Sequence, residues 1–138
     1  MSRFKLAPML ALVLSAAACH SNNTNLVAPT PTPDPVTNTF TGTLSRNGAS
    51  NFQFSVSGSG IVYVTLTSVA DGITPVGLSL GTWNIASGSC TTVLANDLAA
   101  QGAIITGAVT GIGTLCARVY DVGKVVDPLD YELTVVHP

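Results

Sequence analysis

The chain has 138 residues, of which 46% are hydrophobic and only 9% are charged, with a formal net charge of −2. Soluble domains are typically about 25% charged, and this length allows one ordinary domain once terminal segments are set aside. After residue 20 the only basic residues are Arg46, Arg118 and Lys124, against seven acidic ones, so the chain lacks the basic patch that a nucleic-acid-binding surface needs.

Residues 1–18 have the three-part form of a secretory signal. Arg3 and Lys5 supply the positive start, residues 6–14 supply an apolar run, and residues 15–18 are the small Ser-Ala-Ala-Ala. The apolar run is shorter than the roughly 20 residues of a membrane-spanning helix. We therefore predict that this segment is a signal peptide, removed from the mature protein.

The small residues stand directly before Cys19, and this pattern resembles the lipobox of bacterial lipoproteins, although residue 16 is Ala where that family usually has Leu. The resemblance implies cleavage before Cys19 and a lipid anchor, such as palmitate, on this residue, which would attach the protein to a membrane. His20 stands where lipoproteins of the inner membrane usually have Asp, so the resemblance favours the outer membrane, on its periplasmic side or exposed at the surface. The alternative is a plain secretory signal followed by a chance cysteine.

Residues 19–37 contain no periodic apolar pattern, and Pro29, Pro31, Pro33 and Pro35 alternate with Thr and Asp. Each proline fixes its own φ and biases the preceding residue towards extended conformations. The segment is therefore predicted to be a polyproline-II linker, rising ~3.1 Å per residue in its proline-rich part, that holds the following domain away from the membrane.

Residues 38–138 alternate apolar inner with polar outer positions, as β-strands do, and turn signals recur roughly every 8–12 residues. No segment has helical periodicity beyond two turns, and residues 92–101 would supply at most one short helix. The sequence therefore predicts one all-β domain, an antiparallel β-sandwich of jelly-roll-like form with about eight strands. The expected strands are 39–45, 51–57, 61–67, 76–83, 91–95, 103–109, 115–120 and 131–135.

Three aromatic residues are candidates for a ligand-binding surface, because they fall opposite the aliphatic faces of their strands. Trp83 and Tyr120 would form a stacking platform for a sugar or a protein. The alternative for Trp83 is that it closes the end of the core, since tryptophan is often largely buried. Tyr63 carries the same ambiguity.

Three cysteines are present, and the lipobox accounts for Cys19. Cys90 and Cys116 then remain in the folded part of an exported protein, where an oxidising compartment favours a disulfide. Two separate buried thiols are the alternative.

Two stretches resemble the bacterial pre-peptidase C-terminal domain, a jelly-roll-like sandwich often appended to secreted enzymes. Residues 40–44 (FTGTL) with 51–56 (NFQFSV) are similar to its opening, and 116–120 (CARVY) with 130–135 (DYELTV) are similar to its closing hairpin. The resemblance covers roughly residues 38–136 and implies a non-catalytic accessory or adhesion-like module. Some members bind calcium or extracellular polymers, but Leu-Ser-Leu at 78–80 lacks the family's central Asp, which argues against calcium.

The sequence contains few side chains that could catalyse a reaction or bind a metal ion. Nucleophilic catalysis needs a hydroxyl or thiol beside an oriented base, and we expect neither His20 nor His137, the penultimate residue, to be oriented by a packed site. We therefore predict no enzyme, no zinc site and no cofactor. Oxygen ligands suited to calcium cluster only near the last loop, at Asp121, Asp127 and Asp130, where solvated turn residues are the simpler interpretation.

The sequence thus predicts a lipid-anchored, non-catalytic β-sandwich of the cell envelope, anchored through Cys19, that serves surface display, adhesion or binding of an extracellular protein or polysaccharide. The alternative function is a carbohydrate-binding module that uses its exposed aromatic residues.

Overall fold

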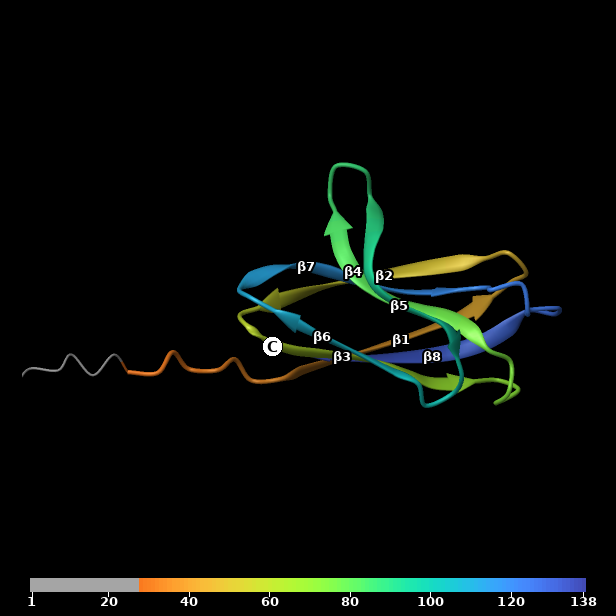
Figure 1. Cartoon of the computed structure of the whole chain (residues 1–138), viewed down its shortest axis with the longest axis horizontal. Coiled ribbons are helices and arrows are strands. Elements are labelled where there is room, and N and C mark those ends of the chain that lie inside the picture. Colours follow the sequence, from red (N-terminus) through yellow and green to blue (C-terminus); the bar gives the residue numbers. More distant parts are fainter. Residues whose placement is uncertain (1–27) are drawn as a thin grey trace, which may run out of the picture.

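The structure is a computed structural model that describes residues 28–138, and within them it contains eight β-strands and no helix (Figure 1). The predicted signal peptide, Cys19 and the first part of the linker lie outside the described residues. The strands are β1 (Val36–Leu44), β2 (Ala49–Ser57), β3 (Gly60–Val69), β4 (Val76–Asn84), β5 (Ser89–Ala99), β6 (Ile104–Val109), β7 (Ile112–Tyr120) and β8 (Leu129–His137).

The strands form two four-stranded sheets that pack face to face. Sheet 1 has the order β1-β8-β3-β6, sheet 2 has the order β2-β7-β4-β5, and all paired neighbours are antiparallel. Every connection crosses from one sheet to the other except the β4–β5 hairpin. This is the strand order of a jelly roll, in which eight strands form a double sheet. The predicted antiparallel β-sandwich is confirmed.

One core lies between the sheets, and side-chain alternation along the strands builds it. In β3, Val62 and Val64 are fully buried, whereas Ile61 and Tyr63 between them are 44% and 43% exposed. The core residues come from both sheets and the adjoining loops. They are Leu44, Phe54, Val56, Val62, Val64, Leu66, Val69, Val76, Leu78, Leu80, Ala99, Ile105, Ala117, Val119, Val125, Leu129, Tyr131, Leu133 and Val135.

The strand boundaries differ from the expected ranges by one to four residues, and two of the differences change the interpretation of the sequence. Residues 92–101 lie in the long strand β5 and the turn that follows it, so the short helix that the sequence allowed there is absent. β1 begins at Val36, two residues before the expected start of the domain, because Val36 already pairs with His137 of β8. A long-range partner therefore extends the strand into the predicted linker.

The two ends of the sandwich have different roles in the chain. Residues 28–35 leave the domain at the end that also holds the C-terminus (Figure 1). There the Ser57 N–H donates to the Pro138 carbonyl at 3.0 Å, and a Cβ on Gly58 would lie 2.7 Å from Pro33. The loops β1–β2, β3–β4, β5–β6 and β7–β8 gather at the opposite end, so an N-terminal tether would present them away from its anchor.

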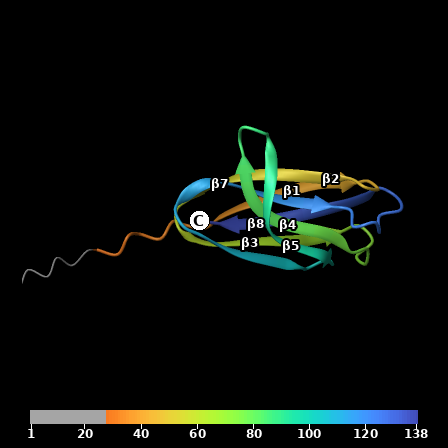
Figure 2. The same cartoon turned by 45° about the horizontal axis from the view of Figure 1, so that its top comes forward.

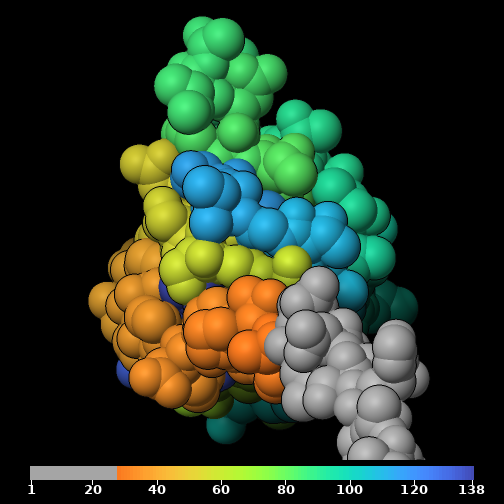
Figure 3. Space-filling model, turned by 90° about the vertical axis from the view of Figure 1, so that its left-hand side faces the viewer, coloured from red at the N-terminus to blue at the C-terminus, as the bar shows by residue number. Residues whose placement is uncertain are grey.

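The β4–β5 hairpin bends out of sheet 2 and projects from the sandwich (Figures 1 and 2); we call residues 82–91 the hairpin arm. The bend follows Leu80, where the register of β4 against β5 shifts. A Cβ on Gly81 would lie 2.0 Å from the Thr91 carbonyl oxygen, so a residue without a side chain is needed for this approach of the two main chains. In the space-filling view from the end where residues 28–35 leave the domain, the arm stands clear of the body (Figure 3).

A disulfide ties the base of the hairpin arm to the neighbouring strand. Cys90 and Cys116 are bonded with their Cα atoms 5.8 Å apart, which confirms the predicted pair. Cys90 is paired with Trp83 in the arm, and Cys116 of β7 is paired with Gly81 of β4. The bond therefore joins β5 to β7 across β4, at the bend itself.

The outer face of β4 is buried, although the sequence pattern predicts outer positions in contact with water. The Tyr120 ring covers Gly77 so closely that a Cβ there would lie 2.1 Å from a ring carbon. Ser79 is fully buried, with the Thr92 hydroxyl 3.5 Å from its own. Because these β4 residues are small, neighbouring strands fold over them.

Candidate functional site

The hairpin arm and the outer face of sheet 2 border a cleft of about 650 Å³. Trp83 and Ile85 line it from the arm. Gln53 and Ser55 of β2 and Thr114 of β7 line it from the sheet. The cleft exists because the arm bends away from the sheet at Gly81. The arm then forms one wall of the cleft, and the outer face of sheet 2 forms the other.

The lining of the cleft combines an apolar wall with polar side chains. Trp83 is half-buried and is not part of the core between the sheets, so it does not close the end of the core. Ile85 beside it is 81% exposed. An amide and two hydroxyls face them from the sheet. Ligand sites typically have such an aromatic surface with a few polar groups that fix orientation, and the lining contains no titratable side chain.

Tyr120 lies on the same face of sheet 2, but its ring is occupied by contacts within the protein. The ring packs on Gly77, and the hydroxyl donates to Asp97 Oδ1. Burial of the hydroxyl and this bond to Asp97 raise the pKa of Tyr120 to about 12. By strand register Tyr120 is opposite Gly77, six residues along β4 from Trp83, which is roughly 20 Å of extended strand.

Tyr63 lies on the outer face of sheet 1 and is 43% exposed. It is therefore on the opposite side of the sandwich from Trp83. The three candidate residues therefore do not all share one surface, because alternation identifies an outward position but not the sheet that carries it. Of the three, only Trp83 lines the cleft.

The carboxylates predicted as weak calcium ligands serve mainly in loops. Asp121 Oδ1 accepts the N–H groups of Gly123, Lys124 and Val125, and its Oδ2 accepts the Asn47 N–H. The bonds from Val125 and Asn47, in that order, do most to lower the pKa of Asp121 to about 2. Four donors pointing at this carboxylate oppose a cation there.

Replacing Asp121 with Asn should lower the stability of the fold at neutral pH and flatten its acid dependence. The folded-state pKa of Asp121 is about 2, below its ordinary value of 3.8. Its contribution is therefore present above pH ~4 and is lost as the pH falls towards ~2. Urea unfolding of Asp121→Asn at several pH values should show a shallower slope below pH ~4 than the native chain shows. Asp127→Asn, exposed in the same loop, is the control, and identical slopes for all three proteins would contradict the expectation.

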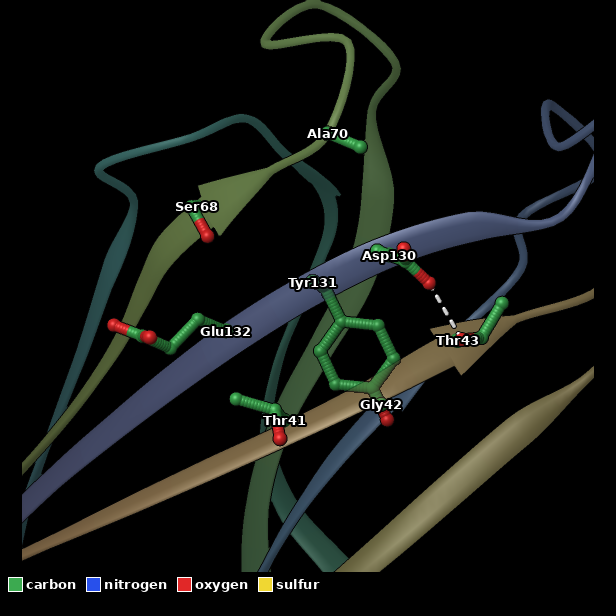
Figure 4. Close-up of a pocket in the computed structure, with 8 residues that line it drawn as sticks. All are labelled: Thr41, Gly42, Thr43, Ser68, Ala70, Asp130, Tyr131 and Glu132. Atoms are coloured by element: carbon green, nitrogen blue, oxygen red, sulfur yellow. Dashed lines mark hydrogen bonds between the residues drawn. The ribbon is translucent and has the colours of Figure 1, made fainter.

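A shallow hollow of about 400 Å³ lies on the outer face of sheet 1, over β1, β8 and the end of β3 (Figure 4). Asp130 and Glu132 of β8 border it, and Asp130 accepts a hydrogen bond from the Thr43 hydroxyl. Tyr131 between them turns its ring towards Gly42. The polar residues of the hollow are largely exposed, and none of its lining residues offers a free aromatic face to a ligand. The hollow is therefore a weaker candidate than the cleft.

His137 is buried and oriented, which the sequence did not lead us to expect. Its Nε2 lies 2.8 Å from Asn38 Oδ1 and its Nδ1 lies 3.1 Å from the Pro138 carbonyl oxygen. Its ring centroid is 5.0 Å from that of Phe54. The Nε2 contact therefore ties the end of β8 to β1, whereas the Nδ1 contact is with the next residue of the chain. Between residues 28 and 138, no three His, Cys, Asp or Glu side chains are grouped to hold a metal ion.

An apolar groove of about 380 Å³ lies along the open edge of the sandwich, where β5 and β6 are the edge strands. Val93 and Leu94 line it from β5, and Ile112 lines it from β7 and is 83% exposed. It lacks the aromatic wall and the amide of the cleft. The cleft beneath the hairpin arm is therefore the stronger candidate for a specific ligand.

Comparisons with known proteins do not identify the function of the cleft. Neither the protein-family models nor the curated proteins contain a match to this chain. None of the secondary structure in residues 28–138 is a helix long and apolar enough to cross a membrane.

Proposed function

We propose that the chain is a lipid-anchored, non-catalytic module of the cell envelope that binds an extracellular polysaccharide in the cleft beneath the hairpin arm. The anchor is proposed from the signal-like residues 1–18 and from Cys19, and the outer membrane from His20. The resemblance to the pre-peptidase C-terminal domain supports an accessory role of the sandwich.

The single observation that carries the ligand class is the position of Trp83 in the cleft. A half-buried indole faces Gln53, Ser55 and Thr114 across about 650 Å³. A sugar ring has an apolar face that packs on an aromatic ring and hydroxyls that pair with amides and hydroxyls. The cleft offers both kinds of contact, whereas the groove between β5 and β6 is mostly apolar.

Two features of the cleft support binding without chemistry. General acid–base and nucleophilic catalysis both need a titratable or activated group at the substrate, and the cleft residues are aromatic, aliphatic, amide, hydroxyl or glycine. The arm also projects from the side of the sandwich (Figures 1 and 2), so a polymer passing across sheet 2 would reach the cleft without displacing the tether at the end of the domain.

Replacing Trp83 with Ala should weaken polysaccharide binding by a factor of ten or more, about the effect of removing a central tryptophan from an interface. The full chain, purified from the membrane fraction in detergent, is tested against a panel of immobilised neutral and acidic polysaccharides. Tyr63→Ala on sheet 1 is the matched control and should bind as the native chain does.

Two results would contradict this proposal. Equal binding by the native chain and Trp83→Ala would remove the cleft as the binding site. Recovery of the full chain in the soluble fraction would remove the lipid anchor and leave the binding module to be considered as a secreted protein.

A further inference from the structure

We infer that the site has an anionic subsite on sheet 2, in which Arg118 binds a carboxylate of an acidic polysaccharide such as a polyuronate. The inference rests on the proposed function and specifies its ligand. It comes from the position of Arg118 on the same outer face as the cleft, where strand register places it between Asn51 of β2 and Ser79 of β4.

The guanidinium group of Arg118 is held in place by an aromatic ring rather than by a carboxylate. Its Cζ lies 5.0 Å from the centroid of the Tyr120 ring, a cation–π distance. Its Nε is buried and has no hydrogen-bond partner among residues 28–138, and the residue as a whole is only half-buried. The Nη end is therefore the part that meets a ligand, and two Nη donors suit the two oxygens of a carboxylate.

Tyr120 gives Arg118 a rigid base. The ring of Tyr120 rests on Gly77, and its hydroxyl is bonded to Asp97 Oδ1. A guanidinium stacked on a fixed ring loses less conformational freedom when a ligand binds. The contact that makes Tyr120 unavailable as a stacking platform thus makes it a support for Arg118.

The distribution of charge leaves this face open to an anion although the chain is acidic overall. Asp130 and Glu132 lie on the outer face of sheet 1, and Asp121 and Asp127 lie in the β7–β8 loop. Asp97 is the carboxylate that reaches the face of sheet 2, and one of its oxygens accepts the Tyr120 hydroxyl. Asp130 and Glu132 are thus on the opposite side of the sandwich from Arg118, and the nearby Asp97 is engaged with Tyr120.

The distance between Arg118 and the cleft fits a polymer rather than a single sugar. Arg118 is opposite Ser79, four residues along β4 from Trp83, which is about 13 Å of extended strand. Gln53 of β2, which lines the cleft, lies on the same face between the two, and Asn51 is level with Arg118. A chain stacked on Trp83 would therefore pass polar side chains before a carboxylate further along it reached Arg118.

The test compares a polyuronate with the same polymer after its carboxyl groups have been reduced to alcohols. The full native chain should bind the polyuronate about tenfold more tightly, the effect of one charge-assisted contact, and added salt should weaken this preference. Arg118→Gln should abolish the preference and keep the binding of the reduced polymer. Arg118→Lys should keep part of the preference for the polyuronate. Arg46→Gln in the β1–β2 loop is the control and should keep all of it. Thermal unfolding of each variant separates loss of binding from loss of fold.

The outcomes distinguish this inference from the proposed function. Trp83-dependent binding of both polymers with equal affinity, or an unchanged preference in folded Arg118→Gln, overturns the anionic subsite alone. Failure of the native chain to bind either polymer, or any other polysaccharide, overturns the proposed function together with the subsite. If Arg118→Gln unfolds, the test rests on Arg118→Lys. A preference of this variant for the polyuronate that equals that of the native chain and does not change with salt would exclude an ionic contact and overturn the subsite.

Discussion

Replacing both Cys90 and Cys116 with alanine should lower the free energy of unfolding by about 3.5 kcal/mol, the value that chain entropy assigns to a loop of this size. The two residues are 26 apart in sequence and are bonded in the structure. Cys116 is fully buried, so the smaller side chain also leaves a gap beneath the arm that adds to the loss. This loss is large compared with the roughly 5–15 kcal/mol of a typical domain.

The loss should appear in urea unfolding of the double variant, measured beside the native chain with and without a reducing agent. Reduction of the native chain should reproduce most of the effect, since it opens the same cross-link without removing the sulfur atoms. Equal stability of the oxidised chain, the reduced chain and the double variant would show that the bond contributes nothing. Because the disulfide lies at the bend, the variant should also lose affinity for a ligand of the cleft.

Much of the fold could be predicted from the sequence because its strands follow a simple rule. Alternation correctly marked the inner faces of β3 and β8, where Val62 and Leu133 are fully buried. The cysteine pair followed from the predicted compartment and the number of cysteines, and the structure contains that bond. Both arguments use local pattern or counting, which do not depend on knowing which strands are neighbours.

The binding surface could be predicted only in part, because it depends on which strands become neighbours. Alternation placed Trp83, Tyr120 and Tyr63 outward, but strand order puts Tyr63 on the other sheet and the Tyr120 ring over Gly77. The arm depends on a register shift near Gly81, which no periodicity reveals. A signal was present, however, since two glycines alternate with leucines in residues 77–81, and glycine within a strand often marks close main-chain approach.

Replacing Gly81 with Ala should therefore lower the free energy of unfolding more than a methyl group added at any other strand glycine. The new Cβ would lie 2.0 Å from the Thr91 carbonyl oxygen and 2.7 Å from its carbon. These are main-chain atoms, so no side chain can turn aside, and either β5 must shift or the arm must straighten. Overpacking typically costs about 1–3 kcal/mol, and we expect at least the upper end of that range, measured by urea unfolding.

Gly113→Ala is the matched control, because Gly113 is also in a strand, β7, and its new Cβ would have no neighbour within 4 Å. That variant should be as stable as the native chain or slightly more stable, since glycine weakens a strand. Equal effects of the two substitutions would mean that the close approach at Gly81 does not exist. If Gly81→Ala still folds, it should bind polysaccharide more weakly, because Trp83 lies in the arm beyond the bend. A destabilised variant with native affinity would place the ligand elsewhere than between the arm and sheet 2.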